Sequence, residues 1–248
     1  MCPQRSLNNP DSSPNSGPLR EVVSFVRRST RMNDSQRRAW QKGQHLVVDV
    51  PRGERVTSIA ATEPLDWDAL FGRPAELVVE IGCGSGDSLV PMAQARPETN
   101  FVAFEVFEPG AASLLGRVMR AGINNVRLVV ADGAAGLEQL FAPGSLTEIW
   151  SFFADPWHKA RHHKRRLINK QFAELAARRL TPGGLFRAAT DWEDYATWIL
   201  NVLDAEPNLE SCFSGWAPRY AARPVSKYEA RGLAAGRRVF DLCYRRRP

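Results

Sequence analysis

Three successive apolar segments of the chain each end in an acidic residue, and the first segment is followed by a glycine-rich turn. Glu80 precedes Gly82–Gly86, while Glu105 and Asp132 end the second and third segments. Glycines let a backbone turn sharply and approach a ligand closely. Carboxylates there would repel a pyrophosphate but accept hydrogen bonds from an ammonium group or a ribose diol. The pattern favours a cationic nucleoside such as S-adenosylmethionine, although a tight turn and ordinary helix caps would also fit.

A fourth acid, Asp155, follows another apolar segment and precedes Pro156 and Trp157. Proline restricts the residue before it to an extended conformation, so the Asp155 carboxylate is held in place. Trp157 offers a flat apolar face beside it. Together they could position a planar base, but Asp-Pro is also a frequent turn initiator and that alternative stays open.

Two further segments combine polar groups that could contact a substrate. Residues 190–195 (TDWEDY) carry Asp191, which is either a site residue or a cap of the next helix. Residues 223–232 (RPVSKYEARG) place a hydroxyl, an amine and a carboxylate in one short stretch, which could read the edge of a base.

The basic residues concentrate in three segments of the chain. Residues 1–44 carry a net charge of +5, residues 158–170 carry +6 and residues 219–248 carry +7, so the rest carries −12. Such a distribution favours a polyanionic partner, with a merely solvated basic face as the alternative. Three of the four histidines lie within 158–163, but their spacing is not that of a zinc site, and we predict no metal.

Alternating strand and helix patterns must position these groups. Apolar runs predict strands over 76–82, 100–107, 126–132, 146–153 and 184–190, and 3.6-residue periodicity predicts helices between and after them, over 88–95, 110–121, 136–141, 167–180 and 192–204. This order predicts an α/β fold: a doubly wound, mostly parallel sheet with helices on both faces. Residues 237–245 alternate in polarity, which predicts an antiparallel last strand at the end of the sheet, after a loop-rich stretch over 207–236.

Length and composition limit the class of protein. The chain has 248 residues, 44% of them hydrophobic and 24% charged, which excludes a wholly disordered or fibrous protein. No uncharged apolar stretch approaches the roughly 18 residues of a membrane helix. The four cysteines lie far apart, as expected of free thiols in the cytoplasm. We predict a disordered tail over 1–18, a basic extension over 19–74 and one catalytic domain over 75–248.

Five segments, in this order, resemble the bacterial tRNA (guanine-N7-)-methyltransferase family. They are SFVRRSTRM from Ser24, EIGCGSG, FFADPWHKARHHKRRL, TDWEDYA and RPVSKYEARG. The glycine segment is shared by many methyltransferases, whereas DPWHK…RHHKRR and the late S-K-Y-E are specific to this family. The resemblance implies a Rossmann-like class I methyltransferase fold. It also implies transfer of a methyl group from S-adenosyl-L-methionine to N7 of a guanine in the tRNA variable loop, leaving S-adenosyl-L-homocysteine.

The resemblance also implies roles for individual residues. Asp155 would be catalytic. The cofactor would be bound by Glu80, Gly82, Glu105, Asp132 and Asp155. The substrate would be bound by Lys159, Asp191, Ser226, Lys227, Tyr228 and Glu229. RNA would be contacted by Arg161, His162, His163, Lys164, Arg165 and Arg166.

The chain departs from the family pattern at three positions. Ala154 stands where proline is usual, Phe107 where a histidine is common and Ser226 where threonine is frequent. None of these changes removes a group that the chemistry requires. Two alternative functions remain: a class I methyltransferase for another RNA base or a small molecule, and a non-enzymatic RNA-binding protein. The expected partner is tRNA, with no membrane, and the protein is expected to be a monomer or homodimer.

Overall fold

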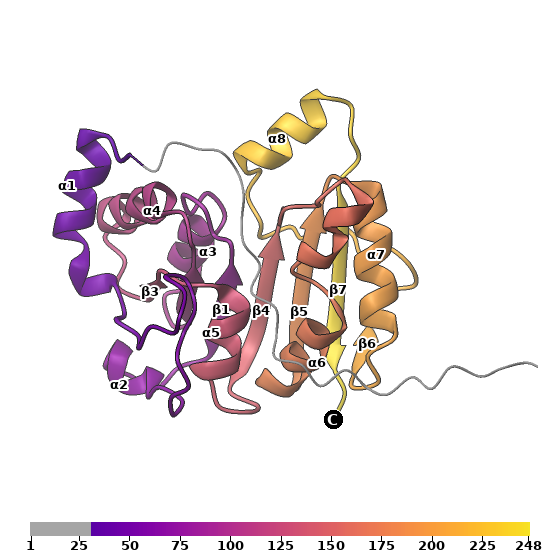
Figure 1. Ribbon diagram of the computed structural model, residues 1–248, viewed down its shortest axis with the longest axis horizontal. Helices are drawn as coiled ribbons and strands as arrows, with labels where there is room; N and C mark the ends of the chain where they lie inside the picture. Colours follow the sequence, from indigo (N-terminus) through magenta and orange to yellow (C-terminus); the bar gives the residue numbers. More distant parts are fainter. Residues whose placement is uncertain (1–30) are drawn as a thin grey trace, which may run out of the picture.

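A seven-stranded sheet in the order β3-β2-β1-β4-β5-β7-β6 forms the centre of the computed structural model, which describes residues 31–248 (Figure 1). The strands are β1 Leu77–Ile81, β2 Asn100–Phe104, β3 Val126–Val129, β4 Leu146–Phe152, β5 Leu180–Thr190, β6 Leu209–Ser211 and β7 Phe240–Arg246. The first five are parallel, and β7 is antiparallel to both β5 and β6. The prediction of a mostly parallel sheet with an antiparallel last strand is confirmed.

Helices follow the strands and cover both faces of the sheet, as predicted. They are α3 Leu89–Ala95, α4 Glu108–Ala121, α5 Gly133–Gln139, α6 Lys170–Arg179 and α7 Glu193–Asp204. Successive strand residues point to opposite faces, so Val79 joins one hydrophobic cluster and Val78 the other. The first cluster packs against α5, α6 and α7, and the second packs against α3 and α4.

The described part of the predicted N-terminal extension shares the core of the rest of the chain. It forms α1 Asp34–Lys42, a 3-10 turn η1 Gln44–Leu46 and α2 Trp67–Phe71. Val48 and Trp67 are buried in the first hydrophobic cluster, and the Val48 amide donates to the Leu128 carbonyl at 2.8 Å. This part of the extension therefore packs into the same hydrophobic cluster as the sheet. The predicted tail over 1–18 lies outside the described residues.

Two short helices lie at the carboxyl ends of the parallel strands: a 3-10 helix η2 Ala160–Arg165 and α8 Lys227–Ala234 (Figure 1). The stretch over 207–236, predicted to be loop-rich, also contains α8, where the Ser226 hydroxyl caps the helix by accepting from the Glu229 amide at 3.2 Å. It contains β6 as well. This three-residue strand forms the edge of the sheet, so β7 is not at its end. Such short elements carry too little periodicity to stand out among prolines and glycines.

Candidate active site

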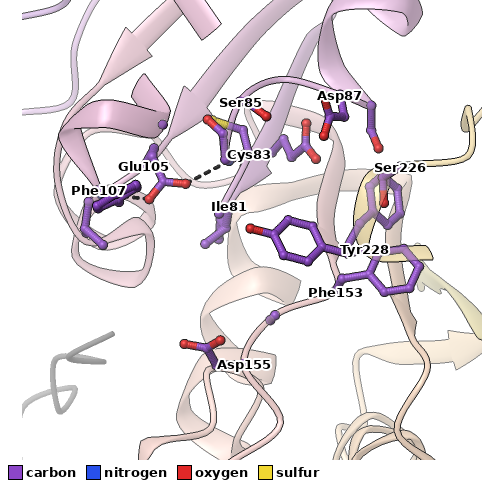
Figure 2. A pocket seen from close by; sticks show the side chains of 18 of the residues that line it. Ile81, Cys83, Ser85, Asp87, Glu105, Phe107, Phe153, Asp155, Ser226 and Tyr228 are labelled. Carbon is purple, nitrogen blue, oxygen red and sulfur yellow. Dashed lines mark hydrogen bonds between the residues drawn. The ribbon is translucent and has the colours of Figure 1, made fainter. Parts of the chain in front are cut away.

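A cavity of about 720 Å³ opens at the carboxyl ends of the parallel strands. The four predicted acids and the glycine turn meet in it, because parallel strands end at the same edge of a sheet. Of the predicted cofactor-binding and substrate-binding residues, those lining the cavity are Glu80, Gly82, Glu105, Asp132, Asp155, Asp191, Ser226, Lys227 and Tyr228. Figure 2 shows Glu105 on one side of this space and Phe153 and Tyr228 on the other.

Glu80 is a buried acid of the cavity with a strongly shifted pKa. It is the last residue but one of β1 and is 3% exposed, and its Oε2 atom has no hydrogen-bond partner within residues 31–248. Burial raises the pKa of this carboxyl to about 8; Glu105 and Asp87 add to the rise and Arg223 opposes it. A buried carboxylate without a donor is costly, so the position is suited to a cationic ligand group that donates to it.

Glu105 fixes the glycine turn. Its carboxylate accepts from the Gly84 amide at 2.7 Å and from the Phe107 amide at 2.8 Å (Figure 2). Since Phe107 binds through its backbone, the departure from histidine at this position leaves that contact in place. Gly82 and Gly84 have φ values of 76° and 57°, which other residues rarely adopt.

Asp132 caps a helix and also lines the cavity. Its carboxylate caps α5 by accepting from the Ala134 and Ala135 amides at 2.9 and 3.0 Å. The same side chain lines the cavity beside Glu105.

Asp155 lies in a loop whose backbone is constrained on both sides. Phe153 and Trp157 have φ values of 57° and 47°, and such left-handed residues cluster at functional sites. The Phe153 amide donates to the Ala189 carbonyl at 2.7 Å, and Arg166 Nε donates to the Pro156 carbonyl at 2.9 Å. The loop therefore presents the Asp155 carboxylate to the cavity in a fixed orientation (Figure 2).

The basic segment divides into surface residues and one buried residue. Lys159, Arg161 and Lys164 are exposed on and beside η2, while His162, His163 and Arg165 are half-buried. Arg166 is 1% exposed and pairs with Asp194. It therefore anchors the Asp155 loop and does not present its guanidinium to RNA. Lys159 does not line the cavity, although its neighbour His158 does.

Two predicted substrate residues are held by arginines. Asp191 lines the cavity and accepts from Arg237 Nε at 2.8 Å. Glu229 is 1% exposed, is paired with Arg219 and does not line the cavity. The family resemblance predicted that Glu229 binds the substrate, but a sequence motif does not reveal that the side chain is buried.

Sequence reasoning missed several residues that line the cavity. They are Gln36, His158, Trp192, Arg231 and Arg237. Gln36 lies in α1 and donates to the Pro109 carbonyl at 3.0 Å. An Asn-x-x-Gln capping box at residues 33–36 was the available signal for this helix. His158 packs on Trp192, with 3.8 Å between ring centroids.

Within the part of the chain that the structure describes, no cluster of His, Cys, Asp or Glu could hold a metal ion. None of the helices described there is long and apolar enough to cross a membrane.

Comparisons with known proteins agree on one family. A family model described as "Putative methyltransferase" matches residues 74–242. A tRNA (guanine-N(7)-)-methyltransferase of Cutibacterium acnes is 53% identical over 92% of this chain and 84% of its own length. Another from Nocardioides sp. is 47% identical over 92% of this chain and 89% of its own length.

Solved structures match in fold only. The 16S rRNA methyltransferase KamB gives a TM-score of 0.54 at 17% identity, over 78% of this chain and 99% of that one. The antibiotic-resistance methyltransferase Kmr gives 0.52 at 18% identity, over 77% of this chain and 96% of that one.

Proposed function

The chain belongs to the tRNA (guanine-N(7)-)-methyltransferase family, and from this we infer that it transfers a methyl group from S-adenosyl-L-methionine to N7 of a guanine in tRNA. The observation that carries this function is the meeting of Glu80, Glu105, Asp132 and Asp155 in one cavity beside the basic helix η2. An acidic pocket suits a cationic nucleoside, and a basic rim suits RNA.

We propose that the cofactor is held by Glu80, Gly82, Glu105, Asp132 and Asp155. The unpartnered Oε2 atom of Glu80 fits the donor that an ammonium group would supply. Glu105 and Asp132 line the same cavity, and carboxylate oxygens accept hydrogen bonds from hydroxyl and amine groups. When bound, the cofactor supplies an electrophilic methyl group, and its product is S-adenosyl-L-homocysteine.

Methyl transfer to guanine N7 needs no strong general base, because N7 already carries a lone pair and no proton. The residues of the cavity therefore act by orientation, which contributes roughly 7–11 kcal/mol in favourable cases. Asp155 stabilises the positive charge that develops on the purine ring or anchors the guanine edge. We place Asp191, Ser226, Lys227 and Tyr228 on the substrate side of the cavity, with Lys159 at its basic rim.

The test of the function is transfer of labelled methyl from S-adenosyl-L-methionine to unmodified tRNA, followed by nucleoside analysis. We expect label in 7-methylguanosine. Label in another nucleoside, or in a small acceptor only, would favour the alternative methyltransferase. Failure to bind the cofactor at all would favour a non-enzymatic RNA-binding protein.

Basic side chains on the rim are expected to bind the tRNA backbone. Arg161→Ala and Lys164→Ala should each weaken tRNA binding about three- to ten-fold and reduce the slope of log K against log salt by about 1, because each removes one phosphate contact. Fluorescence titration over a salt series measures this. The matched control is Arg178→Ala, an exposed arginine at the end of α6, away from the cavity. Unchanged salt slopes in both rim variants would contradict this interface.

Three further features belong to the same proposal. The target guanine lies in the variable loop, the protein works in the cytoplasm and it is a monomer or homodimer. Mapping of the modified nucleotide, cell fractionation and light scattering test them in turn.

A further inference from the structure

A cluster of four charged side chains, three of them buried, lies outside the lining of the cavity, between the loop that leads into α8 and strand β7. Arg223 donates to Asp241 through two nitrogens, at 2.8 and 3.0 Å, and its Nη2 lies 3.5 Å from Glu229 Oε1. Arg219 donates to the two Glu229 oxygens at 2.7 and 3.1 Å. Two guanidinium groups and two carboxylates balance in charge, so the cluster is neutral as a unit.

Glu229 has no path to a substrate in this arrangement. Its side chain is 1% exposed, and both carboxylate oxygens are bound by Arg219. Neither arginine lines the active-site cavity, and Arg219 lies against a separate hollow on β7. The neighbouring Ser226, Lys227 and Tyr228 do line the active-site cavity.

The cluster touches both sides of the reaction site. The Arg223 guanidinium lies over the rings of Phe152 and Phe153, at 5.1 and 5.4 Å from their centroids. Phe153 is the left-handed residue at the start of the Asp155 loop. On the other side, Glu229 belongs to α8, whose first residue, Lys227, donates to Ser85 Oγ of the glycine turn at 2.8 Å.

From these contacts we propose that Arg219, Arg223, Glu229 and Asp241 are positioning residues for methyl transfer. They fix the position of α8 relative to the Asp155 loop on the other side of the cavity. Glu229 acts through Arg219 and Arg223 and does not contact the guanine. The inference rests on the proposed function and adds residues to it that the active-site cavity does not expose.

Arg219 gives the sharpest test, because its side chain is 39% exposed and does not line the active-site cavity. Arg219→Met and Glu229→Gln should each lower kcat by about ten-fold or more, since misplaced reacting groups lose rate steeply. The KM for tRNA and the affinity for S-adenosyl-L-homocysteine should stay within about three-fold. The double variant should be no slower than the slower single variant, because both remove one interaction. Arg219→Lys should recover part of the rate.

Rates are normalised to the S-adenosyl-L-homocysteine sites counted by calorimetry, so that misfolded protein does not mimic a loss of turnover. The matched control is Arg178→Met, which should keep the full rate. Two results would overturn the inference: a normal kcat in Arg219→Met together with a low kcat in Glu229→Gln, or losses in kcat that multiply in the double variant. Either result would mean that Glu229 contacts the substrate directly. A wild-type protein that methylates no tRNA would instead overturn the proposed function.

Discussion

The Asp155→Ala variant is expected to fold, to bind S-adenosyl-L-homocysteine within about ten-fold of the wild type, and to lose about a hundred- to a thousand-fold in kcat. The loss follows from removing a fixed charge where positive charge develops on the guanine. The carboxylate is fixed because Phe153 and Trp157 hold the loop in left-handed backbone conformations on both sides of it. Single-turnover methylation of tRNA measures the rate, and circular dichroism checks the fold.

Asp155→Asn separates two of the ways in which this residue could act, on the developing charge and on the guanine edge. Asparagine keeps an acceptor and the shape of the side chain but loses the charge. A rate near that of the alanine variant would mean that Asp155 stabilises charge, whereas a rate near that of the wild type would mean that it anchors an edge of the guanine. Asp68→Ala, an exposed acid in α2, controls for the loss of a surface carboxylate. Near-normal turnover in Asp155→Ala would remove Asp155 from the mechanism.

The parallel core could be predicted from the sequence because its signals are local. Runs such as LVVEI are apolar except for the acid near their end, as expected of a strand buried on both faces, and β1 is observed at Leu77–Ile81 within the predicted 76–82. Acids at or shortly after the carboxyl ends of such strands then lie at one edge of the sheet, which is why Glu80, Glu105, Asp132 and Asp155 line one cavity.

The roles of buried charged residues could not be predicted in the same way. Arg166 looks like part of a surface basic run, yet its guanidinium reaches Asp194 in α7 and is 1% exposed. Glu229 looks like a loop acid, yet it pairs with Arg219, ten residues earlier in the chain. Both outcomes depend on tertiary partners, and side-chain type alone does not distinguish a buried ion pair from a solvated one.

The pH dependence of cofactor binding is the measurement most sensitive to Glu80. With a pKa of about 8, this carboxyl is mostly protonated in the free protein at pH 6. An ammonium group binds the ionised form, so affinity for S-adenosyl-L-homocysteine should rise as the pH rises from 6 to 8, by up to about ten-fold per pH unit. Isothermal calorimetry at half-unit steps measures this. Affinity independent of pH over this range would contradict the assignment of Glu80 to the ammonium group.

Glu80→Gln should separate binding from stability, because its effects on the two have opposite signs. The native carboxyl keeps a proton that the unfolded chain releases near pH 4.5, so the free energy of unfolding falls as the pH rises from 4.5 to 8, by up to roughly 5 kcal/mol. Glutamine removes that fall, and the variant without cofactor should be more stable than the wild type at pH 8. Its affinity for S-adenosyl-L-homocysteine should drop about a hundred-fold, because the buried acceptor charge is lost. Urea unfolding and calorimetry measure the two quantities, with the exposed Glu98→Gln as control. If the variant instead lost stability at pH 8 and kept its affinity, Glu80 would be a structural acid and the cofactor's ammonium group would have to bind elsewhere in the cavity.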